Sequence, residues 1–110
     1  MIYTLKFTFV FLLLIAINQA SAQNRGQAFG IGMASCGTWA GNPSLSPAIE
    51  AWILGFWTGS NTYSSNRLVG HSTDAHGVIE EVRRICLASP STSLLLATNQ
   101  VHSQMMKEGR

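Results

Sequence analysis

Charge is scarce in this chain of 110 residues, which has seven Lys or Arg, five Asp or Glu and a formal net charge of +2. Binding to nucleic acid or to an anionic membrane surface requires clustered positive charge. The adjacent Arg83 and Arg84 lie beside Glu80 and Glu81 in the sequence, which is typical of a solvated helix face. The sequence therefore predicts neither nucleic acid nor a membrane surface as a partner.

Strand patterns and nucleotide motifs are also missing. Apolar and polar residues do not alternate in the manner of a strand, apart from an ambiguous apolar run at residues 94–96. The pair Gly30-x-Gly32 follows no predicted strand and lacks the third glycine of a dinucleotide-binding fingerprint. An all-α protein without a cofactor is the expectation.

The N-terminus has the pattern of a cleavable secretory signal peptide at residues 1–22. Lys6 precedes an apolar run over residues 7–17, interrupted only by Thr8, and Ala20-Ser21-Ala22 is a small-x-small cleavage site. A transmembrane anchor would need about 20 apolar residues, which this run does not reach. We expect cleavage after Ala22, with loss of the Lys6 charge. A single domain at 23–110 would then reside in the periplasm or outside the cell, with no membrane attachment.

Two cysteines, Cys36 and Cys86, are present, and both lie in the predicted mature part. Exported chains enter an oxidising compartment, where an even cysteine count predicts disulfides. Only one intramolecular pairing exists for two cysteines. Closing a loop of about 50 residues would stabilise a small domain by roughly 4 kcal/mol on the chain-entropy model. The sequence thus predicts a disulfide on which folding depends.

Helix signals divide the mature part into a small bundle. Residues 23–32, rich in Gly, Gln and Asn, predict a flexible, loosely packed N-terminal arm. A short first helix is expected within residues 33–40, before Gly41-Asn42-Pro43 stops it. Ser46 as N-cap and Pro47 predict the start of a core helix that ends near residues 59–61. Its apolar stripe comprises Ile49, Trp52, Ile53, Phe56 and Trp57.

Two further helices are predicted after a polar loop at residues 62–72. Thr73 and Asp74 open the first of them, and Ser89-Pro90 opens the second, which leads into a frayed polar tail. The inward stripe of the first contains Ala75, Val78, Val82, Ile85 and Cys86, and that of the second Leu94, Leu95, Ala97, Thr98, Val101 and Met105. The expected fold is an all-α bundle of three main helices plus a short N-terminal helix, closed by one disulfide.

Candidate catalytic and metal-binding groups form no convincing constellation. His71 and His76 are not at a same-face helix spacing, and with His102 they are expected to be ordinary exposed histidines. A catalytic triad would need a serine, a histidine and an acid that meet in space, and the nearest candidates are Ser72, His71 and Asp74. These three residues lie together at the start of one predicted helix, where helix capping is the simpler role for their side chains. Glu80 and Glu81 are adjacent and point apart on a helix. The sequence predicts no enzyme, no catalytic residue and no metal site.

The most distinctive feature is a set of aromatic residues, Trp39, Trp52, Phe56 and Trp57. Core packing is the simpler interpretation of helical spacing. Trp52 and Trp57, however, cannot both lie at the centre of a narrow stripe, and exposed aromatic side chains mark protein contact surfaces. Both interpretations stay open, and these residues are the candidate protein-binding site.

Three segments together resemble a known family: Cys36-Gly-Thr-Trp39, Trp52-Ile-Leu-Gly-Phe-Trp-Thr-Gly59, and residues 82–94 with Cys86 and Pro90. This layout resembles the HdeA/HdeB-like small periplasmic proteins, which are helical and joined by one disulfide at equivalent positions. The resemblance implies acid-activated, ATP-independent holding of unfolded proteins, although only five acidic residues could switch charge here. The layout is also similar to Tai-like immunity proteins of type VI secretion, which implies binding to an exported toxin. Partners would be other proteins, and homodimer formation is left open.

Overall fold

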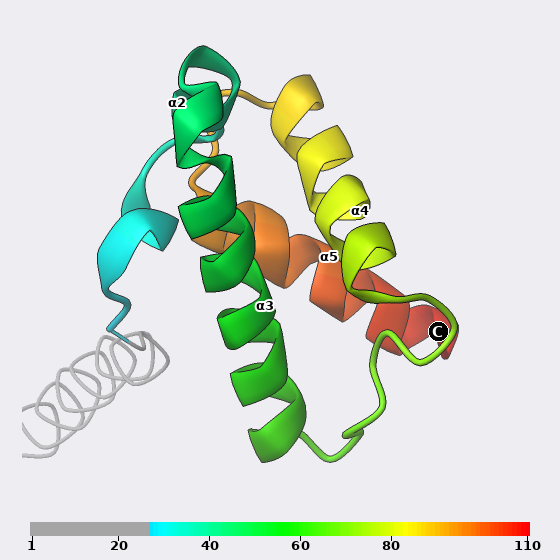
Figure 1. Ribbon diagram of the computed structural model, residues 1–110. Helices are drawn as coiled ribbons and strands as arrows, with labels where there is room; N and C mark the ends of the chain where they lie inside the picture. Colours follow the sequence, from blue (N-terminus) through cyan, green and yellow to red (C-terminus); the bar gives the residue numbers. More distant parts are fainter. Residues whose placement is uncertain (1–26) are drawn as a thin grey trace, which may run out of the picture.

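The computed structural model describes residues 27–110, so the predicted signal peptide at 1–22 and the first residues of the arm lie outside the described part. The elements in chain order are η1 (Gly30–Met33), α2 (Cys36–Gly41), η2 (Pro43–Leu45), α3 (Ser46–Tyr63), α4 (Ala75–Ala88) and α5 (Leu94–Glu108). Helix α5 crosses behind α3 and α4 and packs against both (Figure 1). Residues 27–110 contain no β-strand, and the predicted all-α fold with three main helices and a short first one is confirmed.

Helix α3 carries the predicted apolar stripe, with Ile49, Ile53 and Trp57 buried. It continues past Gly59 to Tyr63, although the sequence predicted its end near residues 59–61. Gly59 does not adopt the left-handed backbone conformation with which glycine commonly ends a helix. The polar cluster at residues 59–61 is therefore half-buried within the last turns of α3 and does not end the helix.

Ser46 was predicted to cap α3 but has a different role. It is the first residue of the helix, and Leu45 occupies the cap position without a side-chain hydrogen bond. The Ser46 hydroxyl instead accepts a hydrogen bond from the Trp39 indole Nε1 at 2.8 Å. A tertiary contact between α2 and α3 therefore uses the oxygen that the sequence pattern assigned to local capping.

Side-chain caps start α4 and α5 slightly later than predicted. Asp74 caps α4, where its Oδ1 accepts from the backbone N–H of Gly77 at 2.8 Å. Ser93, and not Ser89, caps α5 by accepting from the N–H of Leu96 at 3.2 Å. Ser and Asp side-chain oxygens supply acceptors that the free N–H groups of a first helical turn need. Pro90 lies in the turn before α5 and does not begin it.

The predicted inward faces of α4 and α5 are largely correct. The buried residues of α4 are Val78, Ile79, Val82 and Cys86, and those of α5 are Leu94, Ala97, Thr98, Val101, His102 and Met105. Ala75 is exposed because it lies at the open first turn of α4, and Ile85 and Leu95 are half-buried. The core is thus made where α5 crosses the other two main helices.

The disulfide between Cys36 and Cys86 is present and joins α2 to the C-terminal end of α4. Both cysteines are buried. The backbone N–H groups of Cys36 and Gly37 donate to the carbonyls of Thr92 and Pro90 at 2.7 and 2.8 Å, so the turn before α5 satisfies the free N-terminus of α2. The disulfide and these two hydrogen bonds hold α2 against both following helices.

The last residues of the predicted arm are packed and not loose. Gly30–Met33 forms η1, which contacts α3 and α5. Gly32 is buried under the indole of Trp52, and Gly30 has a φ of +83°, which glycine tolerates. The glycines that suggested looseness are therefore required for close approach and for backbone conformation.

The C-terminal end is exposed but hydrogen bonded to the rest of the chain, although the sequence predicted a frayed tail. Gly109 ends α5 in the left-handed conformation with a φ of +69°. Arg110 donates its backbone N–H to the carbonyl of Met105, and its own carbonyl accepts from the N–H of Gly70. The chain end thereby contacts the segment at 64–74 that links α3 to α4 (Figure 1).

Candidate functional site

The four aromatic residues of the predicted binding site separate into two pairs. Trp39 and Trp57 are buried, with 3% and 6% of their surface exposed. Their indole N–H groups are used internally, by the Ser46 hydroxyl and by the carbonyl of Val69 at 2.9 Å. Trp52 and Phe56 are half-buried. Of the predicted residues, only Trp52 and Phe56 therefore offer ring surface to a partner.

An aromatic surface forms where η1 meets α3. The rings of Trp52 and Phe56, one helical turn apart, stack with centroids 5.4 Å apart and planes inclined by 17°. The Trp52 Nε1 donates to the carbonyl of Phe29 at 3.0 Å, which fixes the indole against the chain before η1. Phe29 is 74% exposed and Met33 is 57% exposed. We define the aromatic surface as Phe29, Met33, Trp52 and Phe56.

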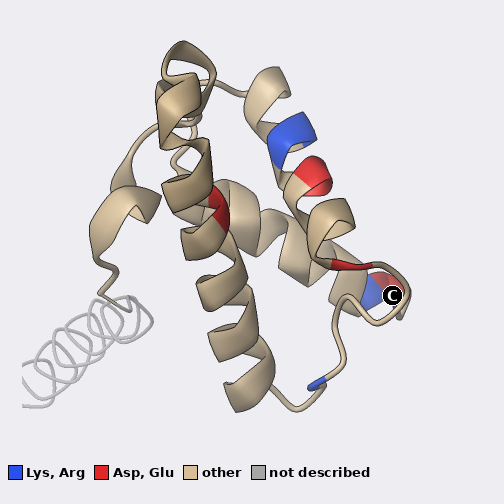
Figure 2. Cartoon of the chain, viewed as in Figure 1, with Lys and Arg blue, Asp and Glu red and all other residues tan. Residues whose placement is uncertain are grey.

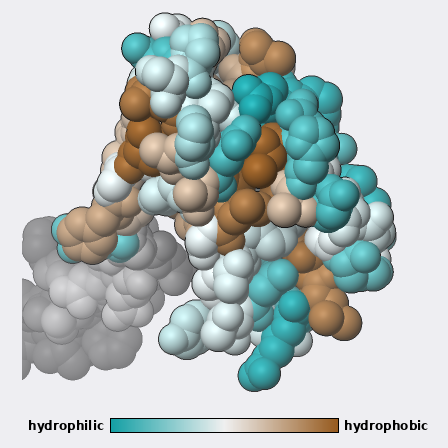
Figure 3. All heavy atoms as spheres, in the orientation of Figure 1, coloured by the Kyte–Doolittle hydropathy of each residue, from teal (hydrophilic) through white to brown (hydrophobic). Residues whose placement is uncertain are grey.

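Among the described residues, the elements that carry this surface have little charge. Helix α3 carries one charged residue, Glu50, and η1 carries none (Figure 2). On the face drawn in Figure 3, apolar residues extend along the edge of the molecule from the N-terminal end of the described chain towards α2. An uncharged surface with large flat side chains loses little polar hydration when a partner covers it.

Phe29 and Met33 were not among the predicted site residues. Phe29 lies in the segment at 23–32 that was predicted to be a loose arm, and Met33 lies at the first position of the predicted short helix at 33–40. The sequence therefore offered no reason to expect the two side chains beside Trp52. The sequence did contain one indication of this surface. Phe29 and Met33 flank Gly30 and Gly32, and glycine often occurs where a backbone approaches another group closely.

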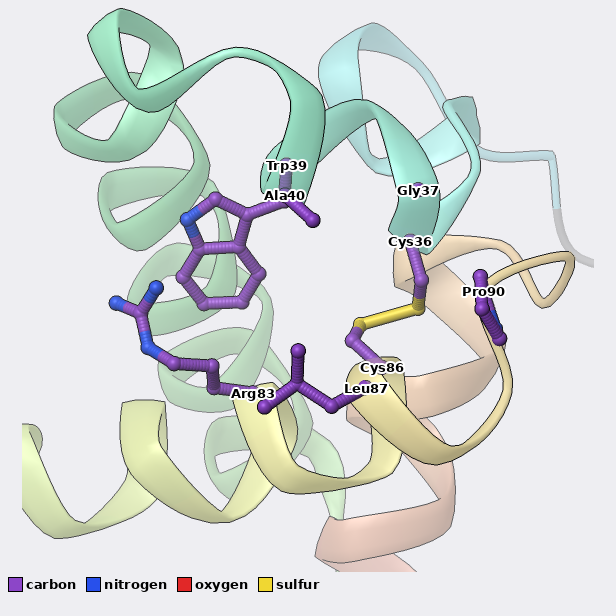
Figure 4. A pocket seen from close by; sticks show the side chains of 8 residues that line it. All are labelled: Cys36, Gly37, Trp39, Ala40, Arg83, Cys86, Leu87 and Pro90. Atoms are coloured by element: carbon purple, nitrogen blue, oxygen red, sulfur yellow. A yellow bond between two sulfur atoms is a disulfide. The ribbon is translucent and has the colours of Figure 1, made fainter.

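Apart from the aromatic surface, an apolar depression of about 110 Å³ lies beside the disulfide (Figure 4). The guanidinium of Arg83 stands 4.2 Å from the ring centre of Trp39 and forms part of its wall, with Leu87 at the rim. Arg83 also pairs with Glu50 at 3.2 Å and with Glu80 at 3.3 Å. Because two carboxylates compensate this guanidinium, the depression has no free positive charge for an anionic ligand.

The expectation of exposed histidines is correct for His71 and His76 and wrong for His102. His102 is 3% exposed, and its Nε2 lies 2.9 Å from Oδ1 of Asn61 on α3. Burial lowers the pKa of the His102 imidazole below its ordinary value. The signal for its burial was its spacing, since residues 98, 102 and 105 share one face of α5.

The remaining candidates for chemistry do not converge within the described residues. Asp74 is engaged as the cap of α4, and Ser72 and His71 are exposed next to it. No group of three or more His, Cys, Asp or Glu side chains among residues 27–110 is placed to hold a metal ion. Arg84 pairs with Glu81 at 2.9 Å on the solvated face of α4 that the sequence predicted.

Comparisons with protein-family models, with curated proteins and with solved structures find no match to this chain. The resemblance to HdeA/HdeB-like and Tai-like proteins stays a prediction from the sequence. No helix within residues 27–110 has the length and apolar character needed to cross a membrane.

Proposed function

We propose that this chain is an exported protein, periplasmic or secreted, which binds other proteins through the aromatic surface and acts as a chaperone-like holder of unfolded chains. The observation that carries the proposal is that the Trp52–Phe56 stack adjoins the segment that holds the exposed Phe29 and Met33. Exposed apolar patches and aromatic anchors are the usual elements of protein contact surfaces.

Two further observations support an exported binding protein. The disulfide between Cys36 and Cys86 is of the kind that persists in oxidising compartments. The described polar side chains that were candidates for catalysis are used for capping or lie apart in solvent, which favours binding over catalysis.

The direct test is suppression of client aggregation, followed by light scattering after guanidinium-denatured citrate synthase is diluted into buffer without reductant, so that the Cys36–Cys86 disulfide stays intact. The variants Phe29→Ser and Met33→Ser remove exposed apolar area without opening the core, and Phe56→Ala removes half of the aromatic stack. Tyr63→Ser is the matched control, because Tyr63 is 92% exposed at the far end of α3. We expect the three surface variants to lose suppression and the control to keep it. Equal activity in all four would refute the proposed surface.

An acid-stress form of this function is part of the proposal. It rests on the resemblance to HdeA/HdeB-like proteins, which implies acid-activated holding of unfolded chains. Client suppression and binding of an apolar dye should then both rise at about pH 2–3, where acid-expanded states expose apolar surface. No rise in either quantity would eliminate the acid-stress form and leave neutral-pH binding intact.

A partner-specific role, such as neutralising an exported toxin, is the second candidate. It is favoured by the fact that the aromatic surface is exposed in the folded protein and needs no opening. A gene for an exported toxin beside this one, together with a saturable one-to-one complex at neutral pH, would favour this role. Titration calorimetry with that toxin and the Phe56→Ala variant distinguishes the two, because a holder of unfolded chains binds no single folded protein.

A further inference from the structure

His102 lies at the junction of α3 and α5 and has no part in the aromatic surface. Its ring approaches Trp57 of α3 with centroids 4.9 Å apart and planes inclined by 72°, in an edge-to-face contact. Its Nε2 is hydrogen bonded to Asn61 of the same helix. A single titratable side chain therefore contacts two residues of the neighbouring helix from a buried position.

The hydrogen bonds of Asn61 determine which nitrogen of His102 carries the proton. The Asn61 Nδ2 donates to the carbonyl of Val69 at 2.9 Å, so its Oδ1 is the atom that faces His102. An amide oxygen only accepts, and Nε2 of His102 must be the donor. The neutral ring consequently has its lone pair on Nδ1, which is the atom that a further proton would occupy.

The groups around His102 do not titrate. Helix α3 contributes Trp57 and Asn61, and the 64–74 segment contributes Val69 through its bond to Asn61. The residues one turn away on α5 are Thr98, Asn99, Met105 and Met106, none of which titrates. The charged residues of these elements are Arg67, Asp74, Lys107 and Glu108, which are exposed, and Glu50, which pairs with Arg83 of α4. No described carboxylate faces the ring to compensate a positive charge.

We propose that His102 and Asn61 form a pH-sensitive clasp between α3 and α5, which loosens when His102 takes up a proton at Nδ1 in mildly acidic solution. The charged ring keeps its Nε2–H bond to Asn61, but its charge lies in a nearly buried position without a compensating carboxylate among the described residues. Opening of the junction returns the charge to water.

The loosening would extend beyond the two helices. The carbonyl of Val69 accepts from both Asn61 Nδ2 and Trp57 Nε1, each at 2.9 Å. The clasp therefore also holds the segment at 64–74 on the end of α3. When His102 leaves its position, the C-terminal half of α3 and this segment lose their shared anchor.

The direction of the pH effect follows from the pKa of His102, which burial lowers from its ordinary value of 6.5. The unfolded chain then binds the proton more readily than the folded one, and stability rises with pH in this range. The contribution of neutral His102 to the free energy of unfolding is fully present above pH 6.5. It is lost as the pH falls through the pKa of His102 in the folded state. Between pH 7.5 and 5.5 carboxylates remain largely ionised, so this window reports on histidine.

The test uses the oxidised protein purified after export, with histidine ring signals followed by NMR from pH 8 to 5. We expect a His102 pKa below 6.5, with His71 and His76 as exposed references in the same spectra. We also expect faster amide exchange in the second half of α3 and in residues 64–74 at pH 5.5, relative to the intrinsic rates. A His102 pKa at or above 6.5 would overturn the proposal, since the contact with Trp57 would then stabilise the cation.

A second measurement is thermal unfolding of His102→Gln, whose amide can still donate to Asn61 but does not titrate. The wild-type melting temperature should fall between pH 7.5 and 5.5, by about 4–8 °C for each kcal/mol of stability lost. The fall should be absent in His102→Gln and preserved in the control His76→Gln. An equal fall in all three proteins would overturn the clasp. If His102→Gln does not fold, the wild-type NMR pKa decides alone, and neither readout depends on the proposed binding function.

Discussion

The indole of Trp52 lies directly over Gly32, so close that a Cβ on Gly32 would overlap its six-membered ring. Gly32→Ala should therefore displace the indole, break its hydrogen bond to Phe29 and destabilise the fold by about 1–3 kcal/mol. Tryptophan fluorescence and urea unfolding measure both effects. Gly55→Ala is the matched control, since nothing lies near a Cβ there and alanine favours the helix. If both variants unfold alike, the close approach at Gly32 has no energetic role.

Cys86→Ser should unfold the domain at neutral pH. The disulfide closes a loop between residues separated by 50 positions, worth about 4 kcal/mol on the chain-entropy model and comparable to the stability of a small domain. Circular dichroism during denaturant titration measures the loss, and reduction of the wild-type protein should reproduce it. Cooperative unfolding at near-native stability in the variant would show that helix packing alone suffices.

Ser46→Ala should destabilise the protein although Ser46 does not cap α3. The variant leaves the Trp39 Nε1–H without its acceptor in a buried position, which costs about 1–3 kcal/mol. The exposed Ser44→Ala is the control, with a change within about 0.5 kcal/mol. Chemical unfolding of the two variants side by side gives the difference, and equal midpoints would contradict the role of this bond.

Ser93→Ala should remove the cap of α5 and lower stability by about 1 kcal/mol, because the N–H of Leu96 loses its acceptor. Ser89→Ala tests the alternative start that the sequence suggested and should have a smaller effect. The ratio of the two losses, measured by thermal unfolding, reports where the helix begins. A larger loss in Ser89→Ala would place the start at Pro90.

Arg83→Lys should cost about 0.5–1 kcal/mol, since lysine keeps the positive charge but cannot present a planar guanidinium to Trp39 while it pairs with Glu50 and Glu80. Arg84→Lys is the control on the exposed side of α4, where a surface ion pair contributes little. Equal stability of the two variants would show that the stacked arrangement adds nothing.

Much of the fold could be predicted from the sequence because helices are encoded locally. The apolar stripes of α3, α4 and α5 follow a helical period that only one face of each helix can bury. The pairing of Cys36 with Cys86 was predicted from the presence of two cysteines in a chain expected to be exported. Secondary structure and covalent connection depend on spacing and count, which the sequence states directly.

The tertiary structure decided the roles of individual polar and small residues. The Ser46 hydroxyl was available for a cap or for a distant indole, and the position of Trp39 selected the second. Gly32 suggested a loose segment from the sequence alone, but in the structure it lies under the indole of Trp52. His102 was expected to be exposed, but in the structure it is buried against α3. The aromatic surface likewise exists only because η1 brings Phe29 to Trp52 across 23 positions of sequence. Such roles depend on contacts between residues far apart in the chain, which local spacing does not contain.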